Sequence, residues 1–179
     1  MNRSEYIDRY KDIVISSTKG TGLFPSVMMA QAILESGNGN TSLASQYNNH
    51  FGVKAGYSWK GYKVNMQTRE VVGGQSQVMG DYFRVYANAS DSFTDRNHLL
   101  ASNDNYIQAG VFSASTAEQQ AIALQRAGYA TDPNYASVLI SLINQHNLKA
   151  LDVVVKKKDY STWLWLPYSW AYPQQEYIS

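Results

Sequence analysis

The sequence of 179 residues contains no cysteine, which excludes disulfide bonds and thiolate metal sites. It also has very little net charge, because 15 Lys+Arg stand against 14 Asp+Glu for a formal charge of +1. A chain so close to neutral has no excess of positive charge with which to wrap nucleic acid, and we expect no nucleic-acid partner. A polymer bound by this chain would be held by shape, stacking and hydrogen bonds.

Long apolar runs are absent as well. No stretch approaches the roughly 18 consecutive apolar residues that a membrane-spanning helix needs, so we expect no membrane span. Residues 1–6 (MNRSEY) lack a basic segment followed by an apolar run, and we therefore expect no signal peptide in this chain. The length suits one domain with a substantial hydrophobic core.

Histidine is scarce, and the three histidines are scattered at His50, His98 and His146. None has a second histidine or a carboxylate at the spacing of a ligand pair on one helix face, so we predict no metal site. The sequence has no phosphate-binding glycine motif and no serine-histidine-acid pattern, and no cofactor is expected. Aromatic residues are plentiful by contrast, with 14 Tyr and 4 Trp, and their flat faces suit sugar rings as well as a core.

Two helices are predicted in the first 36 residues. Apolar residues recur at spacings of three and four over residues 4–17, where Ser4 is placed to cap the start. A more apolar helix follows over residues 25–36, with Pro25 in its first turn and Gly37 as its stop.

The middle of the chain has a different pattern. Residues 38–61 are rich in Asn, Gly, Ser and Tyr, which favours loops. Apolar and polar residues then alternate over 62–72 and 75–86 on either side of a Gly-Gly pair at 73–74, which predicts a β-hairpin.

Helix signals return after the hairpin. Ser92 with Asp95 resembles a capping box, and residues 116–128 form a second helical segment that ends at a glycine. A last helix is predicted from Asp132 onward, with an apolar stripe facing the core. Helices at both ends around one hairpin predict an α+β domain that is mainly α.

Glu35 stands at the end of the apolar helix predicted for residues 25–36. Partial desolvation there, together with the negative end of the helix dipole, disfavours the carboxylate and should raise its pKa. Hydrolysis of a glycosidic bond needs such a group, because a carboxylic acid must still hold the proton that it gives to the leaving oxygen. An ordinary surface glutamate at a helix end would fit the same local pattern.

Five blocks in a fixed order carry a resemblance to a known family: residues 24–39 (FPSVMMAQAILESGNG), 48–54 (NNHFGVK), 83–86 (FRVY), 92–95 (SFTD) and 127–136 (AGYATDPNYA). Together they resemble the glucosaminidase domain of bacterial autolysins and of flagellar rod-associated peptidoglycan hydrolases. The resemblance runs in order over residues 4–150, which makes coincidence an unsatisfactory explanation.

The resemblance implies a lysozyme-like helical domain with a small β-hairpin lobe flanking the cleft. It implies an endo-β-N-acetylglucosaminidase, which cleaves the β-1,4 bond between N-acetylglucosamine and N-acetylmuramic acid in peptidoglycan glycan strands, outside the cytoplasm. We assign residues 1–151 to this domain and expect the aromatic-rich extension of residues 152–179 to pack on it. The oligomeric state is left open.

The resemblance also implies roles for individual residues. Glu35 matches the catalytic acid, and Tyr129 matches a tyrosine close to that acid. Glu70 falls where the second carboxylate is expected and is the candidate base, whereas its rival Asp132 fits a helix cap better. Residues expected to bind substrate along the cleft wall are Asn49, Phe51, Lys54 and Tyr86.

Several alternatives remain open at this stage. The same fold also supports a lytic transglycosylase or a muramidase, and a non-catalytic wall-binding protein would keep the same domain. Within the hydrolase interpretation, the second step could be inverting, retaining or assisted by the acetamido group of the substrate.

Overall fold

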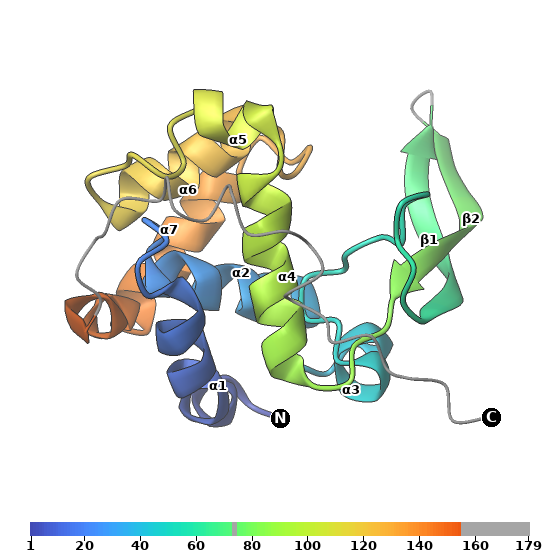
Figure 1. The fold of residues 1–179 in the computed structure, drawn as a ribbon, viewed down its shortest axis with the longest axis horizontal. Helices are drawn as coiled ribbons and strands as arrows, with labels where there is room; N and C mark the ends of the chain where they lie inside the picture. Colours follow the sequence, from blue (N-terminus) through green and yellow to red (C-terminus); the bar gives the residue numbers. More distant parts are fainter. Residues whose placement is uncertain (73–74, 155–179) are drawn as a thin grey trace.

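The computed structural model describes residues 1–72 and 75–154, and for residues 68–72, 75–79 and 154 it describes the backbone alone. Helices are gathered into one body, while a two-stranded sheet projects to one side (Figure 1). The predicted α+β, mainly α class with a β-hairpin lobe is therefore confirmed. The aromatic extension of residues 152–179 lies almost wholly outside the described residues, so its packing stays a prediction.

The first helix, α1 (Arg3–Thr18), is capped by Asn2 and not by Ser4. The side chain of Asn2 accepts a hydrogen bond from the backbone N–H of Glu5, and the Glu5 carboxylate accepts one from the backbone N–H of Asn2. This reciprocal arrangement satisfies two amide groups near the helix start. The prediction for Ser4 was wrong because Ser4 already lies inside the first turn.

Helix α2 (Pro25–Ser36) has the predicted bounds. Pro25 occupies its first position, where the missing N–H interrupts no helical hydrogen bond. Gly37 ends the helix in the left-handed conformation, with a φ of 56°, and its N–H bonds to the carbonyl of Ile33. Local sequence signals therefore fix where this helix stops, one residue after Glu35.

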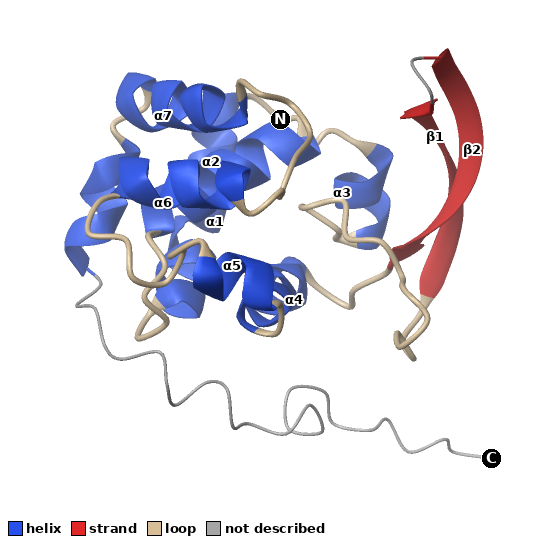
Figure 2. Cartoon of the chain, turned by 90° about the horizontal axis from the view of Figure 1, so that it is seen from above, coloured by secondary structure: helices blue, strands red, loops and turns tan. Residues whose placement is uncertain are grey.

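The predicted hairpin is confirmed as strands β1 (Lys63–Val72) and β2 (Gln75–Arg84). They pair antiparallel, with register from Lys63 opposite Arg84 to Val72 opposite Gln75. The loop before the hairpin is bonded to its base, where the N–H of Ala55 donates to the carbonyl of Tyr82 at 2.7 Å. In Figure 2 the hairpin stands apart from the helical body, beyond helix α3 (Ser42–Tyr47), which the loop prediction for residues 38–61 missed.

Helix α4 (Ala89–Ala101) begins earlier than predicted, because Asn88 caps it and accepts a hydrogen bond from the N–H of Asp91. Ser92 and Asp95 lie inside the helix and are buried, so the capping box predicted for them was wrong. Their side chains bind other segments instead: the Ser92 hydroxyl accepts from the backbone N–H of His50 at 3.1 Å.

The remaining helices are α5 (Asp104–Gln108), α6 (Ala117–Arg126), α7 (Tyr135–Gln145) and the 3-10 helix η1 (Leu148–Val154). Thr116 caps α6, as the predicted start of this helix requires. Helix α7 begins later than predicted. Asp132 accepts the N–H of Asn134 in the turn before the helix, so it ties that turn and does not cap the helix itself.

The core of the domain is organised around α2. Helices α1, α6 and α7 and the 3-10 helix η1 all pack against it. The apolar stripe predicted on α7 is buried at Leu139, Leu142 and Ile143. Within residues 1–72 and 75–154, no helix combines the length and apolar character needed to span a membrane.

Candidate active site

Glu35 is the penultimate residue of α2 and is partly buried. Desolvation raises the pKa of its carboxyl group, as the sequence predicted. One hydrogen bond acts in the opposite direction, because the Tyr135 hydroxyl donates to Oε1 of Glu35 at 3.3 Å and lowers the same pKa. The net direction is upward, so Glu35 holds its proton to a higher pH than an exposed glutamate does.

Tyr135 is the first residue of α7, and its side chain is buried. Its oxygen accepts a hydrogen bond from Nε2 of Gln31 at 2.7 Å. Gln31 lies one turn before Glu35 on α2, so the two side chains share a face of that helix. Neither partner was predicted from the sequence, where Tyr135 belongs to the apolar stripe of the last predicted helix. Gln31 could have been predicted as a partner, because it is a polar residue in an apolar helix and lies four positions before Glu35.

Tyr129 lies beside this pair, in the segment between α6 and α7. Its ring stacks on that of Tyr135, with centroids 5.6 Å apart and planes 20° apart. Burial raises the pKa of Tyr129, the Arg96 guanidinium opposes this shift, and the nearby Glu35 carboxylate adds to it. Tyr129 is therefore close to the acid, as the family resemblance implies, and its catalytic role stays a prediction.

Glu70 lies in β1, where its backbone pairs with Gln77 of β2. Its side chain is outside the described part of the structure, and its role as base stays a prediction. The hairpin that carries it projects from the helical body (Figure 1).

Three of the four residues predicted to bind substrate have buried side chains: Asn49, Phe51 and Tyr86. The Asn49 amide donates to the backbone carbonyls of Val53 and Arg84, at 2.9 Å each. The ring of Phe51 belongs to the core cluster. These two residues hold the loop from within, and a contact between any of the three and substrate stays a prediction.

Lys54, the fourth residue, is half-exposed. Its ammonium group pairs with the carboxylate of Asp81 in β2 at 2.6 Å. This pair links the loop to the hairpin at the surface, and substrate binding by Lys54 stays a prediction as well.

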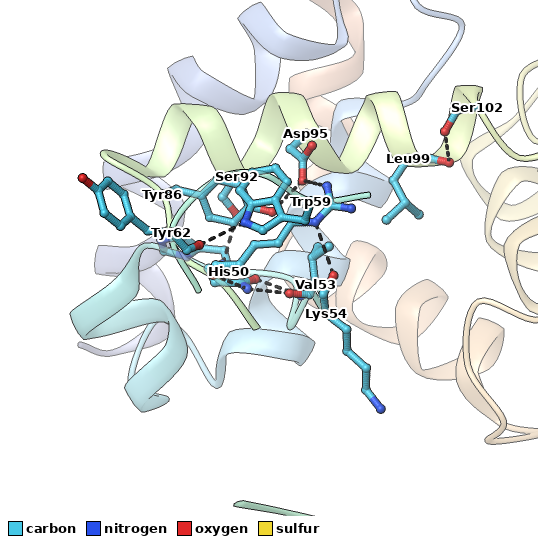
Figure 3. Close-up of polar contacts among 12 residues, drawn as sticks. His50, Val53, Lys54, Trp59, Tyr62, Tyr86, Ser92, Asp95, Leu99 and Ser102 are labelled. Carbon is cyan, nitrogen blue, oxygen red and sulfur yellow. Dashed lines mark hydrogen bonds and ion pairs between the residues drawn. The ribbon is translucent and has the colours of Figure 1, made fainter. Parts of the chain in front are cut away.

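A buried cluster joins the base of the hairpin to α4 (Figure 3). Asp95 accepts from the Arg84 guanidinium and from the Tyr86 hydroxyl, both at 2.6 Å. The Arg84 guanidinium also lies 4.4 Å from the ring centroid of Trp59, a cation–π contact. Arg84 is the last residue of β2, so this cluster fixes the hairpin to the helical body at one end.

The histidines have separate surroundings. His50 is buried, its Nδ1 lies 2.7 Å from the Tyr6 hydroxyl, and burial lowers its pKa to about 4. Burial also lowers the pKa of His98. Nε2 of His146 lies 3.2 Å from the guanidinium of Arg3. Across the described residues, no group of three or more His, Asp or Glu is placed to hold a metal ion.

This chain is similar in sequence to a known family and to several known proteins. A family model described as mannosyl-glycoprotein endo-beta-N-acetylglucosaminidase matches residues 11–148. The chain is 42% identical over 145 residues to the peptidoglycan hydrolase FlgJ of Salmonella typhimurium, a match covering 79% of this chain and 45% of that protein. It is 38% identical over 135 residues to the exo-glucosaminidase LytG of Bacillus subtilis, covering 74% and 47% respectively. The chain thus spans about half the length of these curated relatives.

A solved structure has the same architecture. The catalytic domain of the autolysin Auto from Listeria monocytogenes matches with a TM-score of 0.75 and 30% identity, over 84% of this chain and 87% of that chain. The lysozyme-like hydrolase fold expected from the sequence is confirmed. Since the family model covers most of the chain, from α1 to the start of η1, this chain belongs to the glucosaminidase family.

Proposed function

We propose that this domain hydrolyses the glycan strands of peptidoglycan, at the β-1,4 bond between N-acetylglucosamine and N-acetylmuramic acid, with Glu35 as general acid. The observation that carries the proposal is the partly buried Glu35 carboxyl group, whose pKa is raised while Tyr135 donates to one of its oxygens. Family membership and the names of the relatives support the substrate class. Because peptidoglycan lies outside the cytoplasm, the domain acts there.

In the proposed first step, Glu35 acts as the acid. Glu35 gives its proton to the glycosidic oxygen as the bond from that oxygen to the anomeric carbon breaks, and positive charge develops on the sugar ring. The carboxylate left behind accepts a hydrogen bond from Tyr135, which stabilises the charged form. We further propose that Tyr129, whose ring stacks on that of Tyr135, orients the acetamido group of the substrate or the carboxyl group of Glu35.

The second step needs a nucleophile at the anomeric carbon. Glu70 would activate a water molecule at a carboxyl separation of about 6.5–9.5 Å from Glu35. At about 5–5.5 Å it would instead attack directly and form a glycosyl-enzyme, which water then hydrolyses. Since the hairpin projects from the helical body, we propose that it closes over a bound strand to bring Glu70 toward Glu35. In the third route the acetamido oxygen of the substrate attacks the anomeric carbon, and water then opens the cyclic intermediate, so no enzymic nucleophile is needed.

The decisive experiment is mass spectrometry of purified peptidoglycan after digestion. New reducing N-acetylglucosamine ends support the proposal. New reducing N-acetylmuramic acid ends would make the domain a muramidase, and 1,6-anhydromuramic ends would make it a lytic transglycosylase. Binding without release of any fragment would leave only a wall-binding domain.

Two variants then separate the roles of the carboxylates. Glu35→Gln keeps the size of the side chain but cannot donate an acidic proton, so fragment release should fall at least about 1,000-fold. Glu70→Gln should reduce the rate by a similar order if Glu70 is the base. Retained activity in Glu70→Gln, with Glu35→Gln inactive, would exclude Glu70 and favour the substrate-assisted route.

A further inference from the structure

Arg96 is a buried cation next to the proposed acid machinery. It lies in α4 and is 1% exposed. Its guanidinium donates to Oε1 of Gln31 and, at 3.0 Å, to Oδ1 of Asn97. Within the described residues it forms no ion pair with a carboxylate, since the neighbouring Asp95 binds Arg84 instead. The Tyr129 side chain also interacts with this guanidinium. A buried guanidinium whose hydrogen-bond partners, two amides and a tyrosine, are all neutral is costly in free energy, which suggests a role beyond filling the core.

The hydrogen bonds that start at Arg96 run in one direction. A guanidinium can only donate, so the oxygen of the Gln31 amide must face Arg96 and its nitrogen must face Tyr135. The Tyr135 oxygen therefore accepts from Gln31, and its single proton remains free for Oε1 of Glu35, 3.3 Å away. Each link fixes the next, from α4 through α2 to the first residue of α7.

We propose that Arg96 is a positioning residue that, through Gln31, directs the hydroxyl proton of Tyr135 at Oε1 of Glu35, so that the acidic proton of Glu35 resides on Oε2. This inference rests on the proposed role of Glu35 as general acid. Because Oε1 of Glu35 accepts the hydrogen bond from Tyr135, the proton that Glu35 donates is held on Oε2. Without Arg96 the Gln31 amide could flip, and the Tyr135 proton would no longer be committed to Glu35.

Five titratable or charged groups lie along these hydrogen bonds. They are Tyr106 from α5, Tyr129 from the segment before α7, Tyr135 from α7, Arg96 itself and Glu35. Burial raises the pKa of all three tyrosines. The tyrosines therefore stay neutral over the range in which a carboxyl group titrates, and Glu35 is the member of this group that changes its charge there.

Two substitutions change the local charge by the same amount, but only one of them removes the hydrogen bond to Gln31. Comparing them separates the effect of the Tyr135 hydroxyl orientation on Glu35 from the effect of charge. Arg96→Met removes one positive charge and also removes the donor to Gln31. Asn97→Asp adds one negative charge on the same guanidinium but leaves the bond from Arg96 to Gln31 intact. Arg96→Lys keeps a positively charged donor to Gln31 and should therefore keep the hydrogen bonds from residue 96 through Gln31 and Tyr135 to Glu35.

The measurement is the titration of the Glu35 side-chain carbon by NMR, assigned with Glu35→Gln, together with the melting temperature of each variant. We expect the Glu35 midpoint to rise by about one pH unit in Arg96→Met, because the bond from Tyr135 that favours the carboxylate is lost. It should stay at the wild-type value in Asn97→Asp and Arg96→Lys. Equal shifts in Arg96→Met and Asn97→Asp, or no shift in Arg96→Met, would overturn the proposal.

Gln31→Met supplies a second test if Arg96→Met does not fold. It removes the amide between Arg96 and Tyr135 with no change of charge, so the Tyr135 proton is no longer directed at Glu35. The Glu35 midpoint should then rise by about one pH unit, and an unchanged midpoint would contradict the proposal. The titration needs no turnover, so a protein that releases no fragments would refute the proposed function and still give a result on Arg96.

Discussion

The hydroxyl of Tyr135, at the start of α7, donates a hydrogen bond to Oε1 of Glu35, at the end of α2, across 3.3 Å. The two residues are 100 positions apart in the sequence. Their contact lowers the pKa of a carboxyl group that burial raises, so the pH at which Glu35 loses its proton depends on both effects.

Removal of the Tyr135 hydroxyl should move the pH profile. In Tyr135→Phe the bond that favours the carboxylate is gone, so the pKa of Glu35 rises further. Because the acid must be protonated to act, the basic limb of the kcat/KM profile should shift to higher pH. Loss of the acceptor for Gln31 should also cost about 1 kcal/mol of stability. Tyr106→Phe is the control, because the Tyr106 ring lies 6.2 Å from that of Tyr129 between centroids and, within the described part of the chain, makes no hydrogen bond to Glu35, so it should leave the basic limb in place.

Glu35→Gln should stabilise the protein in a pH-dependent way. Because the folded-state pKa of Glu35 is above its unfolded value, the stability that this proton provides is complete below the unfolded pKa. It is lost as the pH rises through the folded pKa. Glutamine does not titrate, so the variant should match the wild type near pH 4 and have a higher melting temperature at pH 8. A difference that is the same at both pH values would contradict burial as the cause.

His50 should make the domain sensitive to acid. Its folded-state pKa of about 4 lies below the usual 6.5, so the unfolded chain binds a proton that the folded protein does not. Stability should therefore fall as the pH drops from about 6.5 to about 4, by up to about 3 kcal/mol. Urea unfolding at pH 7 and pH 4.5 measures this loss, and His50→Gln should reduce it. The comparison is best made in the Glu35→Gln background, because Glu35 titrates with the opposite sign.

The buried pair of Arg84 and Asp95 should be needed for stability at the hairpin base. Asp95→Asn removes the ion pair between Asp95 and the Arg84 guanidinium, which is 12% exposed, and should cost about 3 kcal/mol. Asp8→Asn, which breaks the exposed pair with Lys11, is the control and should cost less than about 0.5 kcal/mol. If both changes cost the same in chemical denaturation, the cluster does not secure the hairpin.

Much of the fold follows from local sequence signals. Pro25 and Gly37 set the ends of α2 because each restricts or permits a backbone conformation at its own position. Alternation on either side of the Gly-Gly pair at 73–74 predicts the hairpin for the same reason. Local rules failed at Ser92 and Asp95, where the residues of a capping signal are used for bonds to His50, Arg84 and Tyr86 instead.

The sequence by itself determined the position of Glu35, at the end of an apolar helix that its own residues begin and terminate, and the family blocks around it determined its expected role. Only the tertiary structure decided what surrounds that carboxyl group. Helical spacing assigns Tyr135, Gln31 and Arg96 to faces of three different helices, α7, α2 and α4. Whether those faces meet depends on how the helices pack, because a hydrogen bond between distant segments leaves no signal in the local pattern of either one.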